Sequence, residues 1–179
     1  MNVVDMNGLF NTVSNYATTN TGNSIMANGD TTILAVGSYK CSEGTCAGIN
    51  FGMLWTHDLN GEVKCVEDNA SCVLDGENAR RGMYVEGTGS GTLILRALTF
   101  DKGSASIGGG VWIGDGAIVD LELCIFSNNR ATSSDDGGGA IYVLSGGTTV
   151  NVYGTSFNEN TADSGNGDDI YRWSGTITI

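Results

Sequence analysis

The sequence predicts an all-β, single-domain parallel β-helix, a solenoid of about five coils that follows an N-terminal capping helix. Two observations predict this fold class. Short stretches with apolar residues at alternate positions recur about every 29 residues, and the joints between them are polar and rich in glycine. The chain of 179 residues contains 28 glycines and no proline. Alternation with a period of two is typical of strands, so it excludes an amphipathic helical repeat.

Residues 1–24 are predicted to form the capping helix. The apolar residues of this segment approximate helical spacing and are Val3, Val4, Met6, Leu9, Phe10, Val13 and Tyr16. A helix at this place would cover the strand edges and core side chains at the open end of the first coil.

Residues 25–179 are predicted to form the β-helix. One class of strands begins the coils near residues 33, 63, 93, 119, 150 and 177. A second class follows the triple glycines at 108–110 and 137–139, which we interpret as tight corners. Parallel strands one coil apart stack their inward side chains in columns. The expected columns are Leu95, Leu121 and Val152, and Phe100, Phe126 and Phe157.

Several segments resemble known parallel β-helices. Residues 27–39, ANGDTTILAVGSY, resemble the beginning of right-handed parallel β-helix domains of the pectate-lyase-like superfamily. The GGAI segment at 138–141 and the FxxN segments at 126–129 and 157–160 are similar to repeats of chlamydial polymorphic outer-membrane proteins. The coil at 91–117 departs from this pattern, with FDKG and GGGV. The resemblance implies a right-handed coil, and such coils serve enzymes, adhesins and structural rods alike.

The five cysteines suggest two local disulfides. Cys41–Cys46 and Cys65–Cys72 each bracket a short polar loop, and Cys124 is left over. Disulfides indicate an oxidising compartment, so we expect an extracellular or cell-surface protein whose signal peptide is not part of this chain. Asn69 is the acceptor of the one N-glycosylation sequon, within the second loop.

Charge and hydrophobicity exclude two classes of partner. The formal net charge is −12, whereas phosphate binding by nucleic-acid-binding proteins needs clustered Lys and Arg. No apolar run is long enough to span a membrane. We therefore expect neither a nucleic-acid partner nor a transmembrane segment.

Carboxylates gather in two corners, SSDDGGG at 133–139 and DSGNGDD at 163–169. Enzymes of the resembled fold that act on polysaccharides use carboxylates from successive coils, so these corners could form an acidic ridge. The residues considered are Asp135 and Asp136 for a ligand and, for Ca²⁺, Asp163, Asn166, Asp168 and Asp169. The alternative is that Asp and Asn occupy these corners because they favour turns. We expect no cofactor apart from this candidate cation.

Aromatic residues form the other candidate site. Trp112, Tyr142 and Tyr171 each follow an inward apolar residue of the second strand class, so we expect them to point outward in one column. Such a column either stabilises the face by stacking or binds a glycan or protein. His57 is the one histidine, and beside Asp58 it is expected to be an ordinary surface residue rather than a catalytic one.

The function expected from the sequence is a non-catalytic structural, adhesive or assembly role. Residues 177–179 resemble the first strand of a further coil with no cap after it. We therefore expect either that the protein continues beyond residue 179, or that a second copy or a protein partner covers that coil. One alternative is a polysaccharide lyase or glycoside hydrolase that uses the acidic ridge. The other is a glycan-binding or ice-binding module.

Overall fold

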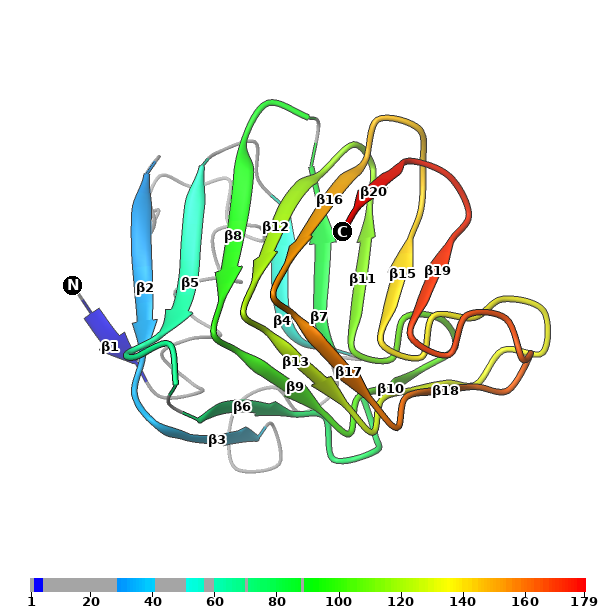
Figure 1. Cartoon of the computed structure of the whole chain (residues 1–179), viewed down its shortest axis with the longest axis horizontal. Helices are drawn as coiled ribbons and strands as arrows, with labels where there is room; N and C mark the ends of the chain where they lie inside the picture. The colour runs from blue at the N-terminus through cyan, green and yellow to red at the C-terminus, as the bar shows by residue number, and fades with distance from the viewer. Residues whose placement is uncertain (1, 5–28, 41–50, 57–59, 70, 88) are drawn as a thin grey trace.

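The computed structural model describes residues 2–4, 29–40, 51–56, 60–69, 71–87 and 89–179, and for 2–4 and 51–56 the backbone alone. Within these ranges the chain is an all-β parallel solenoid of about four turns (Figure 1). The predicted fold class is confirmed, with one coil fewer than expected. The expected first coil includes residues 41–50, which lie outside the described ranges.

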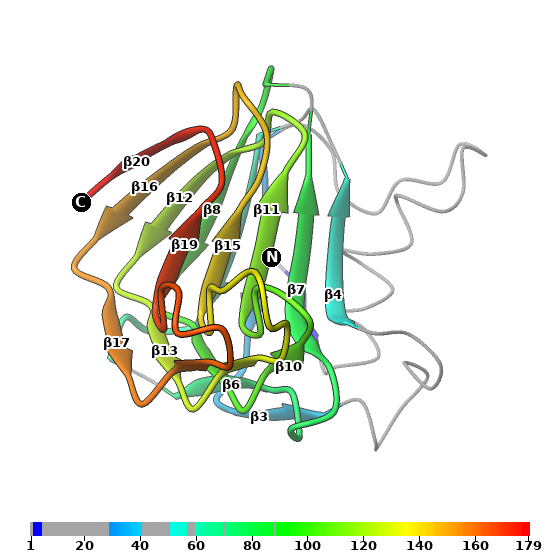
Figure 2. The ribbon, with the colours of Figure 1, turned by 90° about the vertical axis from the view of Figure 1, so that its right-hand side faces the viewer.

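Four parallel sheets, here called sheets 1 to 4, run along the described part of the solenoid (Figure 2). Sheet 1 contains β1 (Asn2–Val4), β2 (Asp30–Leu34), β5 (Gly61–Cys65), β8 (Thr92–Arg96), β12 (Ile118–Glu122), β16 (Thr149–Tyr153) and β20 (Thr176–Thr178). Sheet 2 contains β3 (Gly37–Lys40), β6 (Cys72–Asp75), β9 (Thr99–Asp101), β13 (Ile125–Ser127) and β17 (Ser156–Asn158). Sheet 3 contains β4 (Phe51–Thr56), β7 (Arg81–Glu86), β11 (Val111–Gly114), β15 (Ile141–Val143) and β19 (Ile170–Arg172). Sheet 4 contains β10 (Ser104–Ala105), β14 (Arg130–Ala131) and β18 (Thr161–Ala162).

The core columns of the later turns have the predicted register. Leu121 lies opposite Leu95 on one side and Val152 on the other. The ring of Phe126 stacks between two others, with centroid distances of 4.8 Å to Phe100 and 5.4 Å to Phe157. Because each strand buries alternate residues, the same inward positions meet in every turn.

The register of the first two turns differs from the prediction. Val63 lies opposite Leu95 rather than Leu93, and Ile33 lies opposite Lys64. Thr32 and Leu34 take the inward positions of β2 and stack on Val63 and Cys65. A shift of two residues leaves the same side chains inward, so the alternation in β5 could not reveal it. In β2 the adjacent apolar residues Ile33 and Leu34 fit either face.

The N-terminus begins with a strand. Asn2–Val4 form β1, which pairs with β2 and places Val3 opposite Ile33, so the expected helix does not include these residues. Two consecutive β-branched valines favour a strand, and β2 offers an edge to pair with. Residues 5–24, where the rest of the cap was expected, lie outside the described ranges.

Asparagines form a buried ladder at the corner between sheets 2 and 4. Before this corner, Lys102, Asn128 and Glu159 occupy one place in successive turns and have φ of 52°, 55° and 54°. The next residue is Gly103, Asn129 or Asn160. The Oδ1 atom of Asn129 accepts the Gly103 N–H at 2.8 Å, and its Nδ2 donates to Asn160 Oδ1 at 2.9 Å. The FxxN motif thus combines a core Phe, a left-handed corner and a ladder side chain.

The triple glycines have two separate structural roles. Gly108 and Gly138 occupy one position in successive turns and have φ of 58° and 74°, which a residue with a Cβ adopts at a steric cost. Gly109 and Gly139 lie directly against the backbone of sheet 4, where a Cβ would overlap Arg130 and Thr161. The predicted corner is confirmed, and close packing between sheets adds a second reason for its glycines.

Candidate functional site

The predicted aromatic column exists and is longer than expected. Trp112 lies opposite Tyr142, which lies opposite Tyr171. Tyr84 adds a fourth member, because it pairs with Trp112 and the two rings stack with centroids 4.3 Å apart and planes 3° from parallel. Tyr84 follows Met83 as Trp112 follows Val111, so the sequence pattern contained this residue. We call Tyr84, Trp112, Tyr142 and Tyr171 the aromatic ladder.

The centre of the aromatic ladder is buried rather than exposed. Trp112 is 6% exposed and Tyr142 is 3% exposed, although both lie on the side of their strands away from the core cluster. Aromatic rings in the neighbouring turns cover the ring faces. Gly114 packs closely on Trp112, because a Cβ on Gly114 would overlap the six-membered ring of Trp112. Burial also raises the pKa of Tyr142, with a smaller contribution from Asp136. The ladder therefore acts as packing at its centre.

Tyr84 ends the described ladder on its N-terminal side and has a polar partner. Its hydroxyl donates to Glu86 Oε1 at 2.7 Å. Burial, followed by this hydrogen bond and the charge of Glu86, raises the pKa of Tyr84 above its ordinary value. The phenol thus stays protonated and holds the carboxylate in place.

The two acidic corners lie side by side, one turn apart. The Nδ2 atom of Asn166 donates to the Asp135 carbonyl at 3.2 Å. The backbone N–H groups of Asp135 and Asp136 point at Ser133 Oγ, at 3.2 and 3.3 Å. This is the local hydrogen bonding that a Ser-initiated turn produces. The contact between corners joins Asp135 of the ligand candidates to Asn166 of the cation candidates.

Three carboxylates considered for Ca²⁺ have partners within the protein. Both oxygens of Asp163 accept from Arg130, at 2.9 and 2.7 Å, and the Arg130 side chain lowers the pKa of Asp163. Asp168 accepts the Ala162 N–H at 2.8 Å, and Asp169 accepts from Asn160 Nδ2 at 3.0 Å. In the described part of the chain, no group of three or more His, Cys, Asp or Glu side chains is arranged to hold a metal ion.

Other charged side chains link neighbouring turns along the outer faces. Arg96 joins Asp68 at 2.6 Å and Glu122 at 2.7 Å, and its hydrogen bond lowers the pKa of Asp68. Asp101 accepts from Ser127 at 2.8 Å and from Asn128 at 2.9 Å. These contacts pair side chains one turn apart, as cross-strand neighbours do in any sheet.

The cysteine predictions that the described residues can test are confirmed. Cys65 and Cys72 form a disulfide, and Cys124 is free and buried. The Cys124 thiol lies 3.2 Å from the Leu95 carbonyl, and burial raises its pKa to about 12. Asn69 lies in the exposed turn between the bridged cysteines. Cys41, Cys46 and His57 lie outside the described residues.

The strands β17, β18, β19 and β20 form one end of the solenoid, here called the end face (Figure 2). Core positions at this face are partly uncovered. Phe157, Ile170 and Ile177 pack against the core cluster but are only partly buried, whereas Phe126, Ile141 and Val150 one turn earlier are buried. Trp173 follows β19 and is 63% exposed. Among the residues that the structure describes, each strand at this face has one hydrogen-bonding edge with no neighbouring strand in its sheet.

No described helix has the length and apolar character needed to cross a membrane. Comparison of the chain with protein-family models, curated proteins and solved structures gives no match.

Proposed function

We propose that the chain is a structural module that assembles end to end through the end face. The proposal rests on a difference in burial between equivalent positions of successive turns, because Phe126 is fully buried and Phe157 is not. A further layer of β-structure on this face would bury Phe157, Ile170 and Ile177 and pair the free strand edges.

The partner proposed is a second copy of the chain. In a two-fold dimer the same surface serves both subunits, so the end face needs no other surface to match it. The edge strands of two such faces would meet and pair their backbone groups. The net charge of −12 opposes association of two copies, so added salt should strengthen the dimer.

The arrangement of charged groups supports a non-catalytic role. Among the described residues of the acidic ridge, both oxygens of Asp163 accept from Arg130. Asp168 accepts from a backbone N–H, and Asp169 accepts from Asn160. These carboxylates are held by partners within the protein, so we rank a lyase or hydrolase on the acidic ridge below assembly.

The Cys65–Cys72 disulfide supports the extracellular or cell-surface location that we propose for this module. We also propose a right-handed relationship to the pectate-lyase-like superfamily, on the strength of the segment at 27–39, and to chlamydial polymorphic outer-membrane protein repeats, on the strength of the GGAI and FxxN segments. Their structural roles in the corner glycines and the asparagine ladder are those of a β-helix repeat.

Sedimentation velocity at a series of protein concentrations tests the assembly proposal. We expect a reversible dimer whose dissociation constant decreases as salt increases. The variant I177K places a charge among the partly buried side chains of the end face and should abolish the dimer. The matched variant T178K adds the same charge to an exposed position of the same strand and should leave dimerisation intact. A monomer at all concentrations, or equal association of the two variants, would contradict the proposal.

A glycan-binding role is the second candidate, and the exposed Trp173 favours it. Trp173 follows Tyr171 and Arg172 at the open end of the aromatic ladder. An exposed indole stacks readily on the apolar face of a sugar ring. Loss of binding in W173A on a glycan array that the unmodified protein binds would support this role.

A further inference from the structure

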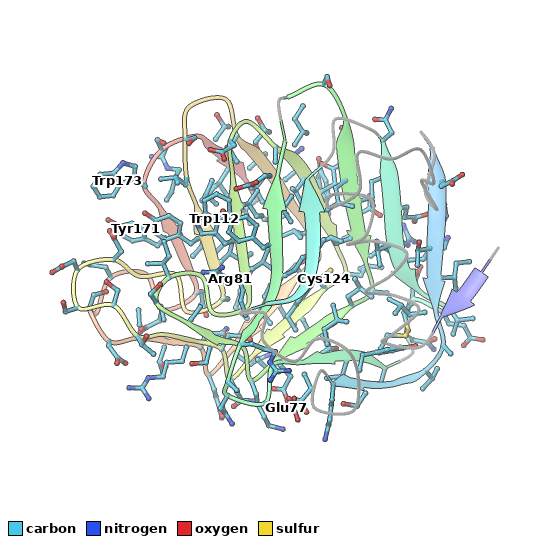
Figure 3. The ribbon with its side chains drawn as sticks, turned by 180° about the vertical axis from the view of Figure 1, so that it is seen from behind. Glu77, Arg81, Trp112, Cys124, Tyr171 and Trp173 are labelled. Atoms are coloured by element: carbon cyan, nitrogen blue, oxygen red, sulfur yellow. A yellow bond between two sulfur atoms is a disulfide. The ribbon has the colours of Figure 1, made fainter. Side chains whose placement is uncertain are left out.

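A depression of about 360 Å³ lies at the junction of sheets 3 and 4, at the start of β7 and beside β10. It is lined by Ala79, Arg81, Ser104, Ala105 and Ser106. Figure 3 shows Arg81 on the same side of the molecule as Trp112, a member of the aromatic ladder. The described lining residues include one arginine and two serines and no carboxylate.

Arg81 differs from the other basic residues in its surroundings. It is 8% exposed, yet it forms no ion pair with a carboxylate of the described residues. The remaining lysines and arginines either form such a pair or, as for Arg172, are exposed. Burial lowers the pKa of Arg81 to about 10, which leaves the guanidinium charged at neutral pH.

The guanidinium is held in a fixed orientation. Its Nε donates to the Gly108 carbonyl at 2.8 Å, and its Nη2 donates to the Ile107 carbonyl at 2.6 Å. Its carbon atom lies 5.5 Å from the centre of the Tyr84 ring, a cation–π distance. These contacts satisfy part of the hydrogen-bonding capacity of the group, which has five N–H donors.

A buried cation without an anionic partner is costly, because neutral carbonyl groups and an aromatic ring replace only part of its hydration. An oxyanion in the depression would compensate the charge. It would receive charge-assisted hydrogen bonds from Arg81 and hydrogen bonds from the hydroxyls of Ser104 and Ser106, which line the same space.

We propose that this depression binds a small oxyanion, with Arg81 as its counter-ion and Ser104 and Ser106 as additional donors. Ligands with this oxyanion chemistry include the carboxylate of an acidic sugar and a sulfate or phosphate group. The net charge of −12 makes the protein as a whole repel anions. The positive charge of Arg81 would therefore make this depression selective for an anion. The proposal does not depend on end-to-end assembly.

Titration of the ¹⁵N-labelled protein tests the site, with sodium sulfate in one arm and sodium acetate in the other. Sodium chloride keeps the ionic strength constant in both arms. We expect saturable shifts of the Arg81 Nε–H signal and of the Ser104 and Ser106 amide signals. Saturation by sulfate indicates a sulfate or phosphate ligand, and saturation by acetate indicates a carboxylate. No saturable shift at these residues with either anion would overturn the proposal.

Charge-matched variants separate the site from general electrostatics. R81Q removes the buried charge and keeps a side chain that can donate to the loop carbonyls, so the affinity should fall at least about tenfold. R172Q removes one exposed charge and should bind as the unmodified protein does. If R81Q does not fold, the double variant S104A/S106A tests the site instead, and its affinity for the anion should fall several-fold. The proposal would be contradicted if R172Q and a folded variant of the site, R81Q or S104A/S106A, bound the anion with equal affinity.

Discussion

Asn129 and Asn160 lie one above the other in successive turns, joined by a hydrogen bond of 2.9 Å from Nδ2 of Asn129 to Oδ1 of Asn160. Asn129 also donates to the Phe100 carbonyl at 2.9 Å and accepts from the Gly103 N–H at 2.8 Å. One buried amide thus hydrogen-bonds a backbone carbonyl and a backbone N–H of the preceding turn. The ladder links three turns at the corner where sheet 2 gives way to sheet 4.

Replacing Asn129 by alanine should strongly destabilise the fold. N129A removes the buried hydrogen bonds of the side chain to the Phe100 carbonyl, the Gly103 N–H and Asn160, which should lower the free energy of unfolding by about 2 to 4 kcal/mol. Urea unfolding measures the change. N151A is the matched control, because Asn151 is half-buried and its side chain donates to Asp120 at 2.8 Å. A loss in N129A no larger than in N151A would contradict this role.

Gly103 is expected to tolerate no side chain, although Asn129 and Asn160 occupy the same position in later turns. A Cβ on Gly103 would overlap the Gly109 carbonyl and lie 2.7 Å from Asn129 Oδ1. G103A should therefore cost about 1 to 3 kcal/mol in unfolding free energy. The control is G146A, since a Cβ there meets nothing within 4 Å. Equal midpoints of thermal unfolding for the two variants would refute the packing argument.

Trp112 should contribute to stability through its burial in the aromatic ladder. W112A removes a large buried ring between Tyr84 and Tyr142 and should lower the unfolding free energy by about 3 to 5 kcal/mol. W173A removes an exposed ring, and its effect should stay within about 0.5 kcal/mol. Denaturant unfolding of both variants, followed by circular dichroism, provides the comparison. A small effect of W112A would mean that the ladder does not support the fold.

Asp101 should make stability depend on pH below neutrality. Although burial opposes its ionisation, hydrogen bonds from Asn128, Ser127 and Lys102 lower the pKa of Asp101 below its ordinary value of 3.8. The folded state therefore favours the charged form, and this stabilisation is present above the unfolded pKa and lost as pH falls through the folded pKa. D101N should be less stable than the unmodified protein at neutral pH.

The difference between D101N and the unmodified protein should shrink as the pH falls below about 3.8. Thermal unfolding at a series of pH values between neutrality and the acid range measures this trend. D135N, which removes one carboxylate from an exposed loop, serves as the control. A difference that grows on acidification would contradict the assignment.

Sequence patterns predicted the later turns better than the first ones. In β8, β12 and β16 the alternation is regular and equivalent apolar residues meet, as Leu95, Leu121 and Val152 do. In β2 the run Ile33–Leu34 is apolar on both faces, and in β5 the register differs by two residues. Alternation identifies the inward face of a strand, whereas register depends on the corners that precede it.

The sequence predicted which residues could form the candidate sites, but it did not predict how buried they are or which groups surround them. The sequence pattern aligned Trp112 with Tyr142 and Tyr171, but the near-complete burial of Trp112 and Tyr142 follows from stacking with the adjacent turns. The sequence did not distinguish Arg81 from the other arginines, because its separation from the carboxylates of the described residues depends on which residues the solenoid places around it.

The sequence by itself determined the parallel solenoid, because a repeat of alternating strands and glycine corners can bury its apolar faces only by stacking turn on turn. It also determined the Cys65–Cys72 bridge, since the two residues are close along the chain. The tertiary structure alone decided which polar side chains have partners. Asp163 meets Arg130, Asn129 meets Asn160, and Arg81 meets the carbonyls of Ile107 and Gly108. Such pairings join residues about thirty positions apart, so they depend on the register between turns, which local sequence does not encode.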